Sequence, residues 1–182
     1  FEDAIKDFDE AIKINPKNLN SLFFKSITQL KIGDYENGWK NYEYRWETTN
    51  FPSPKRKFKQ PCWNGTDNLN DKIILLHGEQ GLGDNIHFSR YFNLVKSKAK
   101  KTLLQVDEKL VQLFKDSNFG DYIFSNNEKL PSFDIHCPLL SLPLKFSTTL
   151  KNIPFNEKYL YPNRDKIIMW KKIFNNQFLN IG

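Results

Sequence analysis

Residues 72–92 read KIILLHGEQGLGDNIHFSRYF, an apolar run followed by a glycine-rich turn and a helix-like pattern. The segment from Lys72 to His77 is short and apolar, as expected for a buried strand. Gly78, Gly81 and Gly83 then follow in quick succession. Glycines let the backbone approach a ligand closely, and a following helix offers free N–H groups at the same place. The stretch therefore predicts a strand–turn–helix unit with a candidate ligand site at the turn.

Strand-like and helix-like segments alternate through the rest of the chain. The sequence predicts further strands at 102–106, 122–124 and 133–136, and helices at 84–98, 108–116, 139–142 and 163–175. Such alternation is typical of a parallel sheet with right-handed crossovers. The expected fold class is therefore α/β, with a Rossmann-like domain.

The first 48 residues carry a different, purely helical pattern. Phe1, Ala4 and Phe8 recur as aromatic or small residues at positions 35, 38 and 42, which is a period of 34 residues. Asn15-Pro16 and Gly33 end two helices, and Asp34 is placed to cap a third that runs to about residue 46. This stretch resembles the end of an array of tetratricopeptide repeats. An unrelated helical hairpin is the alternative, and Arg45 stands where the repeat usually has a small residue.

Charge and cysteine usage restrict the class of protein. The net charge is +6, but the lysines are scattered apart from the clusters at 55–59 and 96–101, so nucleic-acid binding is not expected. Cys62 and Cys137 have neither metal-ligand nor disulfide-framework spacing, which favours a reducing, cytoplasmic location. No stretch approaches the ~20 apolar residues of a membrane span. The chain lacks an initiating Met and stops within the strand-like QFLNIG, so we expect a fragment.

The glycine turn is compatible with several functions. A dinucleotide site is suggested by Asp107 at the end of the next strand, but the glycines are spaced G-x-x-G-x-G rather than G-x-G-x-x-G. Asp84 would also face a bound phosphate, and no Lys-Ser/Thr pair follows the turn. Asp84 and His87 lie three residues apart, so their side chains are neighbours on one helix, and Asp84 can act as a general base. Asp84 can equally be a simple helix cap.

A family resemblance favours the catalytic interpretation of Asp84. The segments ILLHGEQGLGDNIHFSRY, FDIHCPLLSLPLKF and NYEYRW together look like bacterial proteins in which tetratricopeptide repeats precede a glycosyltransferase domain of family 9, the heptosyltransferase group with the GT-B fold. The resemblance implies that Asp84, after Gly83, is the base acting on an acceptor hydroxyl. It implies an inverting, metal-independent transfer from a nucleotide sugar that binds mainly a second domain, so no cofactor or metal is expected here. The residues expected to bind substrate are Gln80, Gly81, Gly83, Asn85, His87, His136 and Ser141.

The resulting domain prediction has four parts. Residues 1–48 are assigned to the repeats, 49–70 to a connector, 71–162 to the acceptor-side domain, and 163–182 to a helix and strand leading to the second domain. The expected partner is a sugar or protein acceptor, with a further protein partner on the repeats. The competing prediction is a non-catalytic interaction module, in which Phe23, Phe24 and Trp39 would contact a partner.

Overall fold

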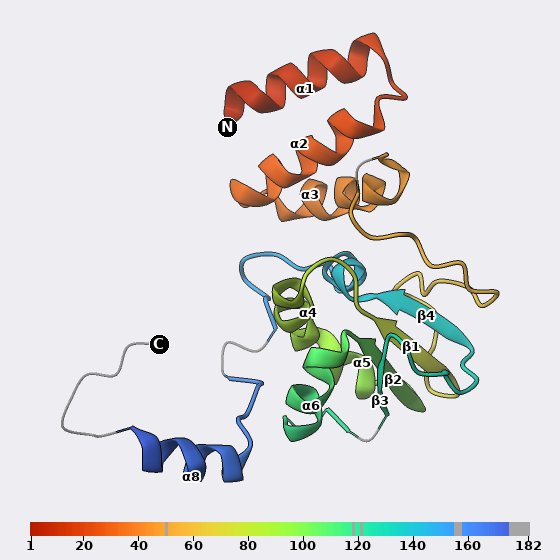
Figure 1. Cartoon of the computed structure of the whole chain (residues 1–182). Helices are drawn as coiled ribbons and strands as arrows, with labels where there is room; N and C mark the ends of the chain where they lie inside the picture. Colours follow the sequence, from red (N-terminus) through yellow and green to blue (C-terminus); the bar gives the residue numbers. More distant parts are fainter. Residues whose placement is uncertain (50, 118, 121, 155–157, 175–182) are drawn as a thin grey trace.

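The computed structural model describes residues 1–49, 51–117, 119–120, 122–154 and 158–174. The helices α1 (Glu2–Ile14), α2 (Leu19–Lys31) and α3 (Tyr35–Tyr42) come first, and the 3-10 helix η1 (Glu43–Glu47) follows them. These elements are stacked on one side of the α/β unit, with α2 between α1 and α3 (Figure 1). A long connector then leads to the first strand.

The ends of these helices follow from local sequence. Gly33 adopts a φ of 87°, the left-handed conformation that glycine adopts without steric cost after a helix. Asp34 caps α3, since its side chain accepts a hydrogen bond from the N–H of Asn37 at 3.3 Å. Asn18 caps α2 in the same way through the N–H of Ser21. The predicted cap at Asp34 is therefore confirmed.

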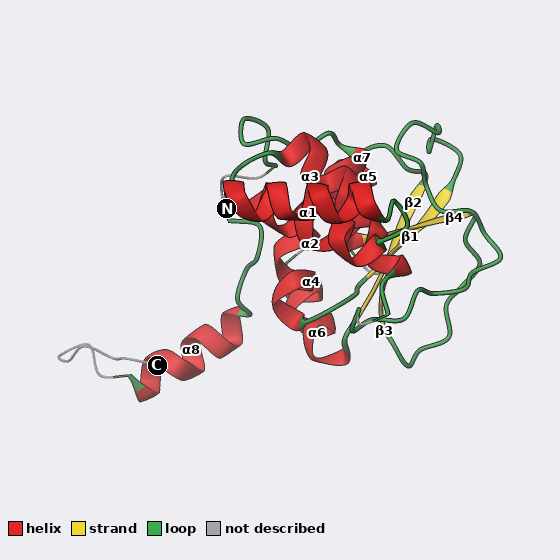
Figure 2. Cartoon of the chain, turned by 90° about the horizontal axis from the view of Figure 1, so that it is seen from above, coloured by secondary structure: helices red, strands yellow, loops and turns green. Residues whose placement is uncertain are grey.

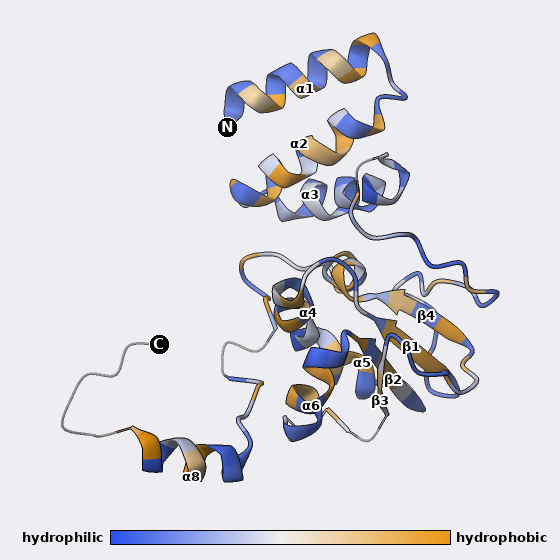
Figure 3. Cartoon of the chain, in the orientation of Figure 1, coloured by the Kyte–Doolittle hydropathy of each residue, from blue (hydrophilic) through white to orange (hydrophobic). Residues whose placement is uncertain are grey.

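The α/β unit is built on a four-stranded sheet in the order β3-β2-β1-β4. Its strands are β1 (Ile73–His77), β2 (Lys101–Val106), β3 (Ile123–Ser125) and β4 (Ile135–Pro138), and every pairing is parallel. The strands carry mainly hydrophobic residues, as expected for a parallel sheet covered on both faces (Figure 3). The predicted α/β class with a parallel sheet is confirmed, and the arrangement is compatible with a Rossmann-like fold.

Helices lie on one side of the sheet and long loops on the other (Figure 2). The helical elements are α4 (Leu82–Phe88), η2 (Ser89–Tyr91), α5 (Phe92–Lys96), α6 (Glu108–Asp116), η3 (Leu139–Ser141), α7 (Leu142–Lys145) and α8 (Arg164–Ile173). Successive side chains of a strand point to opposite faces. Accordingly, Ile74 and Leu76 belong to the same buried cluster as Phe92 and Phe114 of the helices. His77 instead contacts Phe58 of the connector.

The single helix predicted at 84–98 is wrong, because the structure interrupts it at η2. The carbonyl of Ile86 accepts hydrogen bonds from the hydroxyls of Ser89 (2.8 Å) and Tyr159 (3.0 Å). The carbonyl of His87 accepts one from Nε of Arg90 at 3.0 Å. Side chains that bond to backbone carbonyls compete with the helical hydrogen-bond pattern. The helix is consequently split into α4 and α5.

Of the other predicted strands, one is shifted in the structure and one lies outside the described residues. The strand predicted at 133–136 is shifted to 135–138, because Asp134 lies at the strand's edge and its carboxylate accepts a hydrogen bond from the N–H of Ile73 at 2.7 Å. His136 therefore lies within β4 rather than at its end. The strand predicted to begin in QFLNIG lies outside the described residues.

The helical part contacts the α/β unit directly. The indole of Trp39 in α3 packs edge-on against Phe88 of α4, with ring centroids 5.9 Å apart. The hydroxyl of Tyr42 accepts a hydrogen bond from Nε2 of Gln80 at 2.9 Å. Both contacts join α3 to the turn or helix that follows β1.

Candidate functional site

The glycine turn lies at the carboxyl end of β1, beside the point where the strand order changes direction. β1 pairs with β2, which follows it in the chain, on one side and with β4 on the other. Open α/β sheets bind ligands outside the carboxyl ends of the strands at such a switch point. The turn and the first residues of α4 stand at this edge of the sheet (Figure 1). The topology therefore places the sequence-predicted turn where a ligand site is expected.

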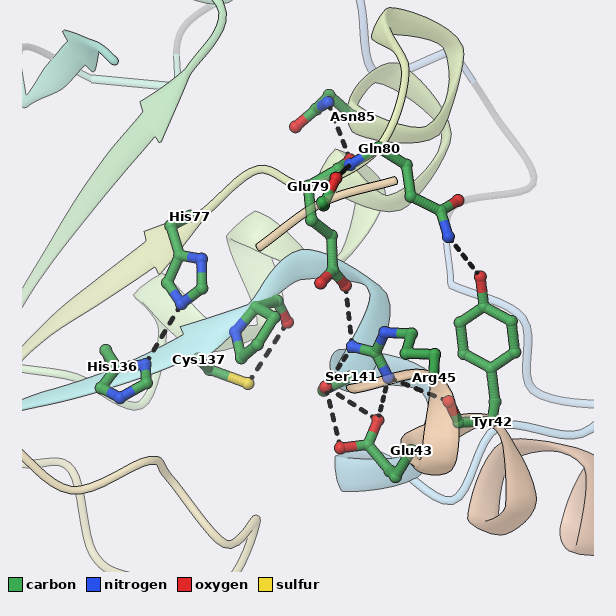
Figure 4. Close-up of polar contacts among 12 residues, drawn as sticks. Tyr42, Glu43, Arg45, His77, Glu79, Gln80, Asn85, His136, Cys137 and Ser141 are labelled. Atoms are coloured by element: carbon green, nitrogen blue, oxygen red, sulfur yellow. Dashed lines mark hydrogen bonds and ion pairs between the residues drawn. The ribbon is translucent and has the colours of Figure 1, made fainter. Parts of the chain in front are cut away.

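Arg45 reaches from the helical part into this edge of the sheet and is fully buried. Its guanidinium forms ion pairs with Oε1 of Glu79 at 2.8 Å and Oε1 of Glu43 at 2.7 Å (Figure 4). It also donates to the hydroxyl of Ser141 at 2.8 Å, and that hydroxyl donates to Glu43. A buried charge is tolerated when it is paired and hydrogen-bonded. Arg45 thus joins η1, the glycine turn and η3 in one polar network.

Glu79 carries the most unusual carboxyl group of this network. Burial raises the pKa of Glu79 to about 7, although the nearby Arg45 acts to lower it. Oε1 is bound to Arg45, whereas Oε2 is buried and has no hydrogen-bond partner among the described residues. A carboxyl with a pKa near neutrality can exchange a proton at physiological pH, which is typical of functional sites.

His77 and His136 form a pair on neighbouring strands. Nε2 of His77 and Nδ1 of His136 are 3.1 Å apart (Figure 4). The ring of Phe58 packs against both imidazoles. Burial lowers the pKa of His77 well below its usual value, with Arg56 and His136 acting in the same direction, and burial also lowers the pKa of His136. Both rings are therefore neutral at pH 7, and one donates to the other.

Two cavities adjoin the turn. The first has a volume of about 320 Å³ and lies over the end of β1, lined by residues including Ser53, Arg56, His77, Glu79, Asn85 and Asn126. The second has a volume of about 520 Å³ and lies between the turn, the connector and α2, lined by residues including Phe23, Phe24, Phe51, Gln80, Gly81 and Asp84. We call them the strand-end cavity and the helix-side cavity. Both are in the size range of small-molecule sites.

Asp84 is half-buried at the rim of the helix-side cavity. It occupies the first turn of α4, and its Oδ2 accepts a hydrogen bond from the N–H of Gly81 at 3.1 Å. This is a helix-capping contact, so the cap role and the catalytic role considered for Asp84 are compatible in one geometry. The other carboxylate oxygen has no hydrogen-bond partner among the described residues and can accept a proton or a ligand hydroxyl.

The remaining residues of the turn are held in position by backbone contacts. Gln80 has a φ of 59°, which is uncommon for a residue other than glycine, and its N–H donates to the hydroxyl of Ser53 at 2.7 Å. Asn85 is buried and donates from Nδ2 to the carbonyls of Glu79 (3.2 Å) and Gly81 (2.7 Å). Hydrogen bonds from the connector and from α4 therefore hold the turn in place. Gly83, inside α4, has open space where a Cβ would be.

The other predicted site residues are not gathered around Asp84. His87 is exposed, packs against Phe88 and makes no hydrogen bond with Asp84 among the described residues. His136 is half-buried and is bonded to His77. Ser141 is 1% exposed, and its hydroxyl accepts a hydrogen bond from Arg45 and donates one to Glu43. The structure thus brings Gln80, Gly81 and Asp84 together at one cavity and places the others elsewhere.

Sequence reasoning missed the charged residues of the site. Arg45 was visible only as a departure from the repeat pattern, and Glu79 only as a neighbour of the glycines. Arg56 was included in a basic linker, yet its guanidinium donates to Gln105 in β2 and to Oδ1 of Asn126 at 2.8 Å. Pro52, Pro54 and Pro61, which flank this segment, indicated only weakly that the connector has a fixed conformation. No local pattern revealed these partners, which are distant in sequence.

Two absences hold for the part of the chain that the structure describes. None of its helices has the length and apolar character needed to cross a bilayer. No group of three or more His, Cys, Asp or Glu side chains is positioned to hold a metal ion.

Comparisons with known proteins found no similarity. No protein-family model matches the chain, and no curated protein and no solved structure matches it. The fold and the site geometry define the class: an α/β protein with an all-parallel sheet, preceded by packed helices, with a polar site at the carboxyl end of β1.

Proposed function

We propose that this chain is the acceptor-side half of a GT-B glycosyltransferase of the family 9 type, preceded by the end of a tetratricopeptide array. The observation that carries the proposal is the position of Asp84, whose carboxylate stands at the rim of the helix-side cavity at the sheet's switch point. The resemblance of the glycine turn to that family supplies the reaction class. The helix stacking of α1 to α3 supports the repeat assignment.

In this proposal Asp84 removes the proton from an acceptor hydroxyl. The resulting oxygen attacks the anomeric carbon of the donor sugar, the bond from that carbon to the nucleoside diphosphate breaks, and the carbon's configuration is inverted. The donor is held mainly by a second domain of the enzyme. The contact from the N–H of Gly81 to Oδ2 holds the carboxylate in place, and Gln80 and Gly81 form the adjacent wall for the substrate.

The test is Asp84→Asn in the full-length protein. Asp84→Asn keeps the size of the side chain and an oxygen that can accept the hydrogen bond from the N–H of Gly81, so the melting temperature should stay close to that of the wild type. Loss of a general base typically lowers turnover by about 10²–10⁴-fold. Turnover is measured as release of nucleoside diphosphate from UDP-, GDP- and ADP-sugars in the presence of acceptor saccharides. His87→Gln is the matched control and should have a mild effect, because His87 is exposed and lies on the same helix. Unchanged turnover in Asp84→Asn would falsify the catalytic assignment.

A second candidate function is protein interaction without chemistry. It is favoured by Phe24 of α2, which is 50% exposed and lines the helix-side cavity. Aromatic residues, phenylalanine among them, are enriched at protein interfaces. Under this alternative, Phe24→Ala would release a bound protein and no nucleotide sugar would be turned over by the wild type.

A further inference from the structure

The connector runs beside β4, the last strand in the order of the sheet. The N–H of His136 donates to the carbonyl of Pro61 at 3.1 Å, and the N–H of Trp63 donates to the carbonyl of His136 at 2.7 Å. Cys62 lies between these two connector residues and is therefore paired with His136 in a parallel bridge. This pairing brings a cysteine of the connector next to Cys137, the following residue of β4.

The separation of the two cysteines suits a disulfide. Neighbouring strands lie ~4.8 Å apart and successive residues rise by ~3.3 Å, so the bridge places the Cα atoms of Cys62 and Cys137 about 6 Å apart. Disulfides usually join residues whose Cα atoms are ~4.4–6.8 Å apart. The thiol of Cys62 also shares a hydrogen bond with that of Cys137. The two sulfur atoms are therefore already neighbours in the folded chain.

The two thiols have different environments. Cys62 is exposed, whereas Cys137 is 0% exposed and belongs to the hydrophobic core, where its Sγ donates to the carbonyl of Pro138 at 3.4 Å (Figure 4). The hydrogen bond with Cys137 lowers the pKa of Cys62, and the cation of Lys145 acts in the same direction, although burial opposes both. Burial raises the pKa of Cys137 well above its usual value. Because the thiolate is the nucleophile, Cys62 is the thiol that reacts first with an oxidant from solution.

We propose that Cys62 is a site of oxidation by peroxides, and that it then forms a reversible disulfide with Cys137. The Cys62 thiolate attacks one oxygen of hydrogen peroxide, the O–O bond breaks, and the departing hydroxide takes up the thiol proton to become water. Cys62 is left as a sulfenic acid. The sulfur of Cys137 then attacks the sulfur of Cys62, the S–O bond breaks, and the oxygen leaves as a second water with the proton of Cys137. The two sulfur atoms together lose two electrons, which the peroxide accepts.

The disulfide joins the connector covalently to the strand that precedes the polar network. Cys137 is followed by Pro138 and then by η3, whose Ser141 is bonded to Arg45 and Glu43. Disulfides in reducing compartments are usually transient and often sense oxidants, so the proposal is compatible with the expected cytoplasmic location. The oxidation chemistry uses only these two thiols and a peroxide, and it does not rest on the proposed glycosyl transfer.

The test is oxidation of the 182-residue chain with hydrogen peroxide at neutral pH, followed by mass spectrometry of the intact chain and of its unreduced tryptic peptides. In the wild type we expect the loss of two hydrogen atoms, a peptide pair joined through Cys62 and Cys137, and a return to the starting mass with dithiothreitol. Cys137→Ala removes the second thiol and keeps the core apolar, so oxidation should stop at a sulfenic acid on Cys62, which dimedone traps. Cys62→Ser removes the exposed thiol, and its buried Cys137 should be oxidised about tenfold more slowly than Cys62, or slower still.

Several results would overturn the inference. These are two intact thiols under conditions that oxidise free cysteine, a disulfide formed only between two chains, a sulfenic acid that persists in the wild type, or equally fast oxidation of Cys137 in Cys62→Ser. Circular dichroism establishes that the variants are folded, and the wild-type cross-link decides the inference even where a variant fails to fold. Asp84→Asn should be oxidised like the wild type. A disulfide without glycosyl transfer would therefore refute only the proposed function, and transfer without a disulfide only this inference.

Discussion

At the scale of single residues, burial and an ion pair have opposite effects on the pKa of Glu79. Its side chain is 2% exposed, and one carboxyl oxygen is bound to Arg45 while the other has no hydrogen-bond partner among the described residues. Arg45 alone would keep the carboxylate ionised at low pH. Burial outweighs it, and the pKa of Glu79 is raised from 4.5 to about 7. The proton on Glu79 is thus available near neutral pH.

The raised pKa of Glu79 predicts a dependence of stability on pH. Between pH 4.5 and 7 the folded protein binds more protons at Glu79 than the unfolded chain does, so the free energy of unfolding falls as pH rises through this range. One pKa unit corresponds to ~1.4 kcal/mol, so the loss has an upper limit of about 3 kcal/mol. We expect the melting temperature to fall more between pH 5 and pH 8 in the wild type than in Glu79→Gln.

The comparison of the two proteins isolates Glu79 from its titratable neighbours. His77 and His136 have lowered pKa values in the folded protein and therefore raise stability as pH increases, and they are present in both proteins. Arg45, Arg56 and Glu43 also remain in both. Glu36→Gln, a change at an exposed surface pair, should keep the wild-type pH profile. Coinciding profiles for the wild type and Glu79→Gln would contradict the prediction.

At the scale of elements, the sequence predicted what depends on neighbours along the chain. Helix α6 occupies 108–116 as expected, because Asp107 caps it and its apolar residues share one face. The interruption between α4 and α5 was not predictable, since one of the hydroxyls bound to the carbonyl of Ile86 belongs to Tyr159, 73 residues away. The candidate site likewise contains a part that the sequence predicts and a part that it does not. The glycine turn and Asp84 form a local pattern, whereas the pairing of Arg45 with Glu79 spans 34 residues.

The glycine turn supplies a prediction at this scale. A Cβ on Gly78 would lie 1.8 Å from Oδ1 of Asn85, so Gly78→Ala must displace the amide that bonds to the carbonyls of Glu79 and Gly81. Overpacking or loss of a buried hydrogen bond each costs ~1–3 kcal/mol. Gly83→Ala is the matched control, because a Cβ added there would meet nothing within 4 Å beyond its own stretch of helix, and alanine favours a helix. Urea unfolding should show a loss for the first variant and none for the second, and equal losses would refute the packing argument.

At the scale of the whole molecule, the connector is fixed to the sheet along its length. Ser53 accepts a hydrogen bond from the N–H of Gln80, and Phe58 packs on the histidine pair. The N–H of Trp63 donates to the carbonyl of His136 at 2.7 Å. Together with Arg45, these contacts make the helical part a support for the turn. The site therefore depends on the helices that precede it.

This dependence predicts how a protease attacks the chain. The connector carries four trypsin sites at Lys55, Arg56, Lys57 and Lys59, yet its contacts should make cleavage there slow in the wild type. Arg45→Met leaves the buried carboxylates of Glu79 and Glu43 without their cation, and breaking a buried ion pair in this way typically costs about 3–5 kcal/mol. Cleavage within 55–59, followed by mass spectrometry, should accelerate in Arg45→Met. Lys40→Met, which removes only an exposed pair with Glu36, should cleave like the wild type. Rapid cutting of the wild-type connector into two stable pieces would show instead that the helices and the α/β unit are independent, and the support role of Arg45 would then be abandoned.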